Sequence, residues 1–243
     1  MGVFWSPWHG CHRCSPGCKN CYVYFLDKLR EVDSSVVHRC KTGFNLPLKK
    51  NRQGEFKILA GSEVATCFTS DFFLEEADEW RAEAWQIIKA RPDLKFLICT
   101  KRIERVKACL PKDWGAGYEN VAIAVSCENQ LMANKRLPLF LEIPAKKKFI
   151  FVAPILEYVD LKKFLKSGKF DMVSVGGESY KEARVCNFDW IKQIYLDCKS
   201  CGVEFDFHQT GSNFIKDGKC YRLRHSDEHK QAKKALEFLK SNF

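Results

Sequence analysis

Four cysteines lie within eleven residues near the start of the chain, in the stretch CHRCSPGCKNC. They are Cys11, Cys14, Cys18 and Cys21, with the spacing C-x2-C-x3-C-x2-C. Thiolates this close together bind metal in two kinds of site, a structural zinc site and an iron–sulfur cluster. A zinc site would use all four thiolates, whereas a cluster that leaves one iron open to a ligand would use three.

The spacing of the cysteines favours an iron–sulfur cluster. Structural zinc sites usually separate two C-x2-C pairs by about a dozen residues, so that two loops surround the ion. Only the three residues SPG separate the two pairs in this chain. Cys14, Cys18 and Cys21 have the spacing of a three-thiolate [4Fe–4S] site, whose irons are spread in space and accept thiolates from one loop. The alternatives are zinc, and thiols that bind no metal or respond only to the redox state.

The cysteine content and the first residues predict a compartment. The chain has thirteen cysteines, and its first ten residues, MGVFWSPWHG, lack the charged and apolar segments of a secretory signal. In a reducing cytosol, clustered cysteines are metal ligands or redox groups rather than disulfides. No stretch approaches the ~20 apolar residues that cross a membrane. We therefore expect a cytoplasmic protein that does not associate with membranes.

The charge of the chain is strongly positive. The formal net charge is +10 at pH 7, with basic residues concentrated in a loop at about 40–57 and in a C-terminal tail at about 212–243. Such segments either form a solvated surface or bind an anionic partner such as a nucleic acid, a nucleotide or a phosphorylated metabolite. We expect substrate recognition to use these segments or a second protein, because 243 residues leave little chain beyond one barrel.

Short apolar runs alternate with amphipathic segments along the chain, which predicts one α/β domain at 1–243. The runs are rich in Val, Ile and Phe, as buried parallel strands are. We predict strands at 2–5, 63–69, 94–100, 120–126, 147–153, 170–176 and 203–209. We predict helices at 22–32, 78–90, 137–143, 160–168, 187–202 and 230–242, the fifth ending at Gly202.

Seven mainly parallel strands predict a partial (β/α) barrel, with a doubly wound open sheet as the alternative. Both folds place the active site at the carboxyl ends of the strands. Five of these ends carry hydrogen-bonding or charged side chains, which predicts that a site converges there. Turn and cap hydrogen bonds are the alternative explanation of the same residues. The residues are Ser70, Asp71, Thr100, Lys101, Arg102, Ser126, Glu128, Glu178, His208 and Gln209.

The x3-x2 cysteine spacing after a first strand, at the head of a predicted partial barrel, resembles the radical S-adenosylmethionine (SAM) superfamily. In that superfamily three cysteines hold a [4Fe–4S] cluster, and the amino and carboxylate groups of SAM bind the fourth iron. One electron then cleaves SAM to methionine and a 5′-deoxyadenosyl radical, which takes a hydrogen atom from the substrate. The resemblance implies an enzyme with a [4Fe–4S] cluster, SAM as cofactor and an electron donor as partner.

A second similarity runs through nearly the whole chain. Segments that include WSPWHGC, CFTSDFFLEEADEWR, ICTKRIER and FHQTGSNFIKDGK are similar to a small phage and bacterial family of three-Cys-motif proteins of unknown function. The three cysteines of that family correspond to Cys11, Cys18 and Cys21, whereas the superfamily spacing selects Cys14, Cys18 and Cys21. The two resemblances agree on Cys18 and Cys21, and they leave the third ligand open between Cys11 and Cys14.

The superfamily resemblance also implies roles at the strand ends. Asp71 and Ser70 are candidates for the SAM amino group, and Lys101 or Arg102 for its carboxylate. Ser126 and Glu128 are candidates for the ribose hydroxyls. The full set of expected cofactor contacts is Tyr22, Ser70, Asp71, Thr100, Lys101, Ser126 and Glu128. The residues expected to face the substrate are Glu178, Gln209 and His208.

The basic charge and the phage-associated similarity indicate a nucleic acid or nucleotide as the substrate class. Two functions of other classes also fit the residues. One is a nucleic-acid-binding module that zinc or a cluster stabilises without catalysis, and it predicts tight, salt-sensitive binding. The other is a nucleotide-binding barrel whose cysteines sense only the redox state.

Overall fold

The computed structural model of the chain describes residues 2–243 and divides into two compact units. Unit 1 contains the residues up to His12 together with Asp27–Ala124 and Glu142–Lys147. Unit 2 contains Arg13–Leu26, Val125–Leu141 and Lys148–Phe243. The boundary between the units therefore falls inside the four-cysteine stretch, between Cys11 and Cys14.

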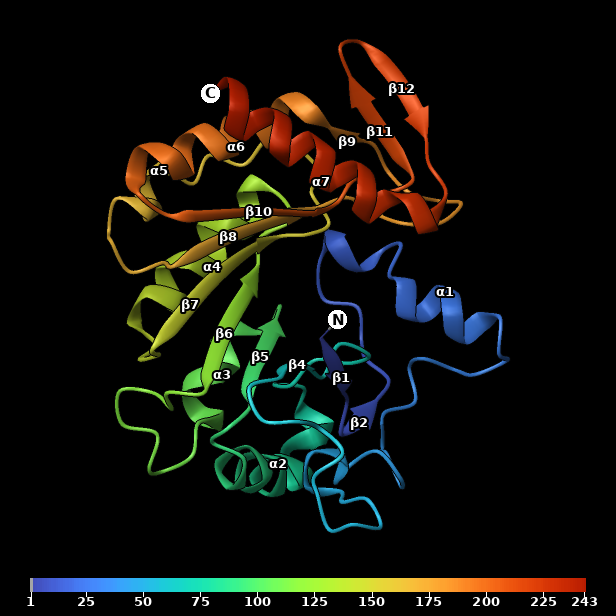
Figure 1. Cartoon of the computed structure of the whole chain (residues 1–243), viewed down its shortest axis with the longest axis vertical. Helices are drawn as coiled ribbons and strands as arrows, with labels where there is room; N and C mark the ends of the chain where they lie inside the picture. Colours follow the sequence, from blue (N-terminus) through green and yellow to red (C-terminus); the bar gives the residue numbers. More distant parts are fainter. Residues whose placement is uncertain (1) are drawn as a thin grey trace. The chain divides into compact units, whose positions relative to one another are not determined.

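A seven-stranded sheet is the main element of the fold (Figure 1). Its strands follow one another in the order of the sequence, without the reversal that marks a doubly wound sheet. The pairs β1–β4, β4–β5, β7–β8 and β8–β10 are parallel. The prediction of a mainly parallel α/β fold that matches a partial β/α barrel is confirmed. The strands are β1 Val3–Trp5, β4 Glu63–Thr66, β5 Lys95–Thr100, β6 Val121–Ser126, β7 Lys147–Val152, β8 Met172–Gly176 and β10 Glu204–Gln209.

Unit 1 packs around two buried tryptophans. Trp5 lies on β1 and Trp8 on the short strand β2 (Trp8–His9), which pairs with β3 (His38–Arg39). Both indoles are fully buried, and each donates its N–H to a backbone carbonyl, of Phe44 at 2.8 Å and of Asp71 at 3.2 Å. Because each indole N–H has an acceptor, the rings fill the core without leaving a buried polar atom unpaired. The helices of unit 1 are η2 Leu46–Leu48, η3 Glu75–Ala77, α2 Asp78–Ala90 and α3 Ile103–Cys109.

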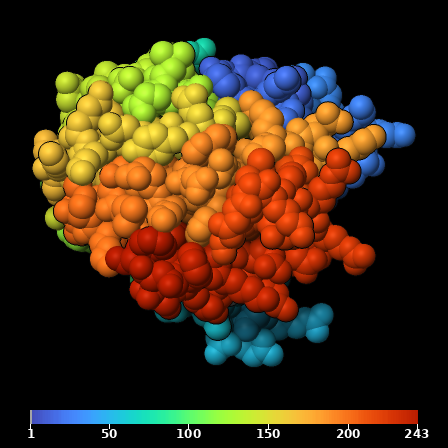
Figure 2. Space-filling model, turned by 90° about the horizontal axis from the view of Figure 1, so that it is seen from above, coloured from blue at the N-terminus to red at the C-terminus, as the bar shows by residue number. Residues whose placement is uncertain are grey.

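Unit 2 contains the remaining helices and a small second sheet of order β12-β11-β9. Strands β11 and β12 form an antiparallel hairpin whose turn residues, Asp217 and Gly218, both have positive φ. This is the backbone of a type I′ turn, for which Asp-Gly is a preferred pair. Figure 2 shows the hairpin and α7 on one face, in orange and red. The elements are η1 Pro16–Cys18, α1 Tyr22–Lys28, α4 Gln130–Glu142, α5 Lys162–Leu165, β9 Cys186–Asn187, α6 Phe188–Cys201, β11 Asn213–Lys216, β12 Lys219–Arg222 and α7 His225–Asn242. The last residues of α1, from Asp27, and of α4, at Glu142, belong to unit 1.

The predicted helices differ from the observed ones mainly in length. Helix α2 has the predicted bounds, and α6 ends at Gly202 in the left-handed conformation, as predicted. Helix α4 begins seven residues before the predicted start at 137, because the side chain of Asn129 accepts the Met132 N–H at 2.9 Å. It also continues through Pro138, which the prediction had placed in the first turn.

Candidate functional site

The cysteine loop, residues 14–21, lies within unit 2. Cys14 is exposed, and Cys18 and Cys21 are partly buried. Elsewhere in unit 2, Cys186 and Cys198 are buried thiols, and burial raises the pKa of both, that of Cys198 to about 12. Those two side chains are therefore protonated and pack as small apolar groups. The loop thiols differ from them because solvent and ligands can reach them.

Glu128 ties the loop to the carboxyl end of β6. The Gly17 N–H donates to Glu128 Oε1 at 3.0 Å, and Arg136 Nη1 donates to Glu128 Oε2 at 2.7 Å. Arg136 also donates to the carbonyl of Ser126 at 2.8 Å. A Cβ at position 17 would lie 3.1 Å from the carboxylate, so the glycine permits this close approach. The carboxylate predicted to bind ribose thus holds the cysteine loop.

Glu178 holds the other side of the loop, after β8. Asn20 Nδ2 donates to Glu178 Oε2 at 3.1 Å, and the backbone N–H of Arg184 donates to the same oxygen at 2.8 Å. The guanidinium of Arg184 pairs with both Glu178 oxygens and donates to the carbonyl of Pro16 at 3.0 Å. Burial raises the pKa of Glu178, but the hydrogen bonds from Arg184 and Asn20 outweigh it and hold the pKa below its usual value. The carboxylate is therefore ionised at neutral pH.

These contacts assign a structural role to two of the predicted site residues. Each loop-facing carboxylate is buried and has its own arginine, Arg136 for Glu128 and Arg184 for Glu178. Neither arginine nor Asn20 was predicted. Asn20 and Arg184 lie in polar loops without periodicity, and Arg136 lies just before the helix predicted at 137–143. Direct contact of Glu128 or Glu178 with a cofactor or substrate stays a prediction.

In unit 1, Asp71 gathers the predicted residues at the ends of β4 and β5. Its Oδ1 accepts hydrogen bonds from Thr100 Oγ1 at 2.8 Å and from the Phe73 N–H at 3.0 Å. Its Oδ2 accepts the Lys101 N–H at 2.9 Å and lies 3.3 Å from Arg102 Nη1. The structure therefore brings these predicted residues together. The carboxylate predicted to bind the SAM amino group thus accepts three hydrogen bonds and pairs with Arg102.

The first cysteine is held in unit 1 by the same strand ends. Arg102 Nη2 donates to the carbonyl of His12 at 2.7 Å, and Arg102 Nη1 lies 3.7 Å from Cys11 Sγ. The Ser70 hydroxyl donates to the carbonyl of Gly10. Ser70 and Arg102, which were predicted to contact SAM, thus fix the backbone on each side of Cys11.

The remaining predicted residues lie in unit 2. Gln209 Nε2 donates to the carbonyl of Gly177 at 2.6 Å, which closes the end of β10 against β8. His208 is partly buried, and burial lowers its pKa below the usual value. Tyr22 begins α1 and is 41% exposed.

The two kinds of cysteine site require different groupings of metal ligands. Within residues 2–243, no three His, Cys, Asp or Glu side chains are grouped so as to hold a metal ion. A four-thiolate zinc site requires its sulfurs around a single ion at about 2.3 Å each. The described residues thus contain no ready-made site for one ion. A [4Fe–4S] cluster places its thiolates differently, because each thiolate binds a different iron.

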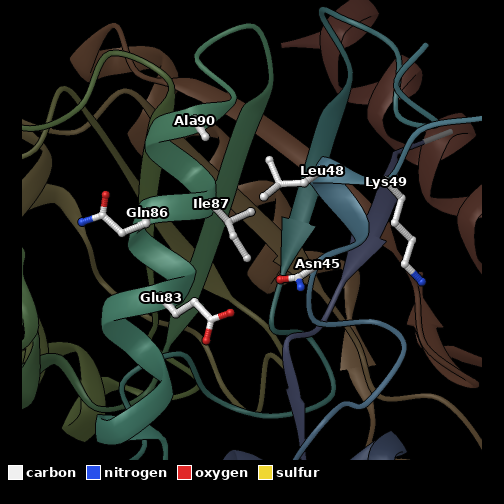
Figure 3. A pocket seen from close by; sticks show the side chains of 7 residues that line it. All are labelled: Asn45, Leu48, Lys49, Glu83, Gln86, Ile87 and Ala90. Carbon is white, nitrogen blue, oxygen red and sulfur yellow. The ribbon is translucent and has the colours of Figure 1, made fainter. Parts of the chain in front are cut away.

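An open groove lies in unit 1, apart from the predicted residues. Helix α2 forms one side of it and the segment around η2 the other (Figure 3). Its lining residues are Asn45, Leu48, Lys49, Glu83, Gln86, Ile87 and Ala90. The lining contains no cysteine or histidine, so this groove adds nothing to the candidate site.

Comparison with known proteins identifies the family. Residues 2–238 match the family described as Protein of unknown function (DUF5131), and the chain therefore belongs to it. Neither the curated proteins nor the solved structures include a match to the chain. Across residues 2–243, no helix is long and apolar enough to cross a membrane.

Proposed function

We propose that Cys14, Cys18 and Cys21 bind a [4Fe–4S] cluster and that the chain is a radical SAM enzyme. The observation that carries the proposal is a loop with three-thiolate cluster spacing, fastened to the strand ends of a partial β/α barrel. When bound, the cluster and SAM supply a 5′-deoxyadenosyl radical by one-electron cleavage of SAM. The chain's own residues hold the loop and shape the site.

The hydrogen bonds of the loop support this proposal. Its backbone is fixed at Gly17 by Glu128, at Asn20 by Glu178 and at Pro16 by Arg184. None of these contacts uses a thiol. Together these contacts fix the backbone of the loop, as the supporting residues of a metal site do.

Cys14 is the third ligand in this proposal, rather than Cys11. Cys14, Cys18 and Cys21 belong to the same compact unit and are at least partly exposed. Cys11 belongs to unit 1, where its sulfur lies beside Arg102.

The proposal is tested on protein purified without oxygen. Iron, sulfide and zinc are quantified, dithionite and SAM are added, and 5′-deoxyadenosine is measured. Cluster absorbance with 5′-deoxyadenosine release is the expected result. Substitution of Cys18 or Cys21 by serine should abolish both signals, whereas Cys220→Ser should retain them, because Cys220 is exposed on β12, outside the cysteine loop.

Two results would contradict the proposal. Stoichiometric zinc without iron, together with tight and salt-sensitive DNA or RNA binding, would favour the non-catalytic module. A cluster that never releases 5′-deoxyadenosine would leave a cluster protein but exclude the radical SAM reaction. Because the basic segments indicate an anionic substrate, nucleotides and short RNA and DNA are the first substrates to add.

A further inference from the structure

His208 is an extra residue in its strand. Strand β10 pairs with β8 in parallel, and Phe207 is opposite Val175. The next pair is Gln209 with Gly176, so the register shifts and His208 has no partner on β8. This is a β-bulge, which is uncommon in parallel sheets and is found next to active sites, where it redirects a side chain.

The glycine opposite the bulge makes room for the imidazole. A Cβ at Gly176 would lie 2.2 Å from His208 Nε2 and 2.5 Å from Cε1. No side chain larger than hydrogen fits there while the ring keeps its place. The bulge and Gly176 thus act together, one to turn the ring and the other to receive it.

The imidazole lies on the less buried face of these strands. Along β7 and β10 the residues alternate, with Ile150, Val152, Phe205 and Phe207 buried and the residues between them more exposed. His208 is among the more exposed set. A polar face at strand ends of a β/α fold is where ligands bind.

Two further side chains on this face determine which ring nitrogen carries the proton. Ser174 Oγ lies 2.8 Å from Asp206 Oδ2 and 2.9 Å from His208 Nδ1. A carboxylate oxygen only accepts, so the single hydroxyl proton of Ser174 goes to Asp206. Ser174 Oγ must then accept from His208, which places the ring proton on Nδ1. The lone pair is on Nε2, to which no hydrogen bond is made within residues 2–243.

We propose that His208 Nε2 is a proton acceptor for a ligand at the carboxyl end of β10, with Ser174 and Asp206 as positioning residues. In the transfer, the O–H or N–H bond of the ligand breaks and an Nε2–H bond forms. The ligand keeps the electron pair, and the positive charge on the imidazolium is stabilised by Asp206 through Ser174. The proposal does not depend on the cluster, because the His208 imidazole can accept a proton whether or not iron is bound.

The surroundings of the ring favour the neutral form. Burial lowers the pKa of His208, with His229 on α7 lowering it further and Asp206 raising it. His229 faces the backbone of His208, since its Nδ1 lies 2.7 Å from the His208 carbonyl. Phe151 on β7 lies beside the ring, with 6.3 Å between ring centroids. The ring is thus unprotonated at neutral pH and ready to accept a proton.

The test measures the tautomer and the accessibility of His208 directly. The whole chain is labelled with 15N-histidine, and the six histidines are resolved by NMR, His208 being assigned with His208→Asn. The expected spectrum has a protonated Nδ1 and an unprotonated Nε2. Ser174→Ala should shift the tautomer ratio about fivefold towards Nε2–H, the factor that corresponds to a hydrogen bond of about 1 kcal/mol.

Diethyl pyrocarbonate, which modifies unprotonated imidazole nitrogens, provides the second measurement. The expected result is modification of His208 in the native protein at pH 7, read by mass spectrometry. Ser179→Ala is the matched control, because Ser179 hydrogen-bonds Glu228 and Gln209 and does not contact His208. A wild-type ring protonated on Nε2, an unchanged ratio in Ser174→Ala, or modification of His208 only after denaturation would each overturn the proposal.

Discussion

Replacement of Glu128 by alanine tests whether buried carboxylates hold the cysteine loop. The change removes the acceptor of the Gly17 N–H and the ion-pair partner of Arg136. Arg136 would keep only its bond to the carbonyl of Ser126. The loop would lose its contact with the end of β6, and a buried guanidinium would lose its countercharge.

The expected loss of stability follows from the burial of the pair. The side chains of Arg136 and Glu128 are 3% and 0% exposed, so water screens the interaction little. Removing one partner of a buried pair destabilises a protein by about 3–5 kcal/mol. Glu128→Gln should lose less, about 1.5–3 kcal/mol, because it keeps an oxygen acceptor but not the charge. Against a typical total of about 5–15 kcal/mol, the alanine variant should remain folded but weakened.

The assay is equilibrium unfolding in urea, with hydrogen exchange of the Gly17 amide as a local measurement. The double variant Glu128→Leu with Arg136→Met is the matched control, because it leaves no unpaired charge. It should recover most of the lost stability while the Gly17 amide still exchanges fast. An alanine variant within about 1 kcal/mol of wild type, or with a protected Gly17 amide, would refute the reasoning.

Three further predictions concern Gly17, Glu178 and His208. Gly17→Ala should destabilise the protein by about 1–3 kcal/mol in urea unfolding, because its Cβ would press on the Glu128 carboxylate; a neutral effect would contradict the described geometry. The pKa of Glu178 is lower in the folded state, so its contribution to stability is present above the unfolded pKa and is lost as pH falls through the folded pKa. The free energy of unfolding of the wild type, measured from pH 7 to pH 2, should show this loss. An equal pH dependence in Arg184→Gln would count against it. The pKa of His208 is also lowered in the folded state, but His208 is a base. Below about pH 6.5 the unfolded state therefore binds a proton before the folded state does, and the stability falls. His208→Asn should flatten the pH dependence of thermal unfolding below about pH 6.5, and an unchanged pH dependence would exclude the lowered pKa.

The seven strands could be predicted from the sequence because each is a local pattern. Runs such as those at 94–100 and 120–126 are apolar over a length that fits a buried strand, and the structure has β5 and β6 there. The end of α6 could be predicted from an equally local signal, because Gly202 takes the left-handed conformation that ends a helix. The Asp217-Gly218 turn has a local signal as well, although residues 212–243 were predicted only as a basic tail.

The partners of the strand-end residues could not be predicted, because they depend on distant parts of the chain. Glu128 lies 111 residues from Gly17, and Glu178 lies 158 residues from Asn20. A carboxylate at a strand end has the same appearance in the sequence whether it binds a ligand or a loop. The pairing of Ser174 with Asp206 and His208 likewise depends on the register of two strands and on a bulge. Such registers are set by the whole sheet.

The most direct test of the proposed function is the amount of iron and inorganic sulfide bound per chain by anaerobically purified wild type, Cys11→Ser and Cys14→Ser. The account predicts about four of each in wild type and in Cys11→Ser, and neither in Cys14→Ser. Loss of iron from Cys11→Ser with a full cluster in Cys14→Ser would contradict the ligand set. Zinc in place of iron in all three proteins would contradict the cluster itself.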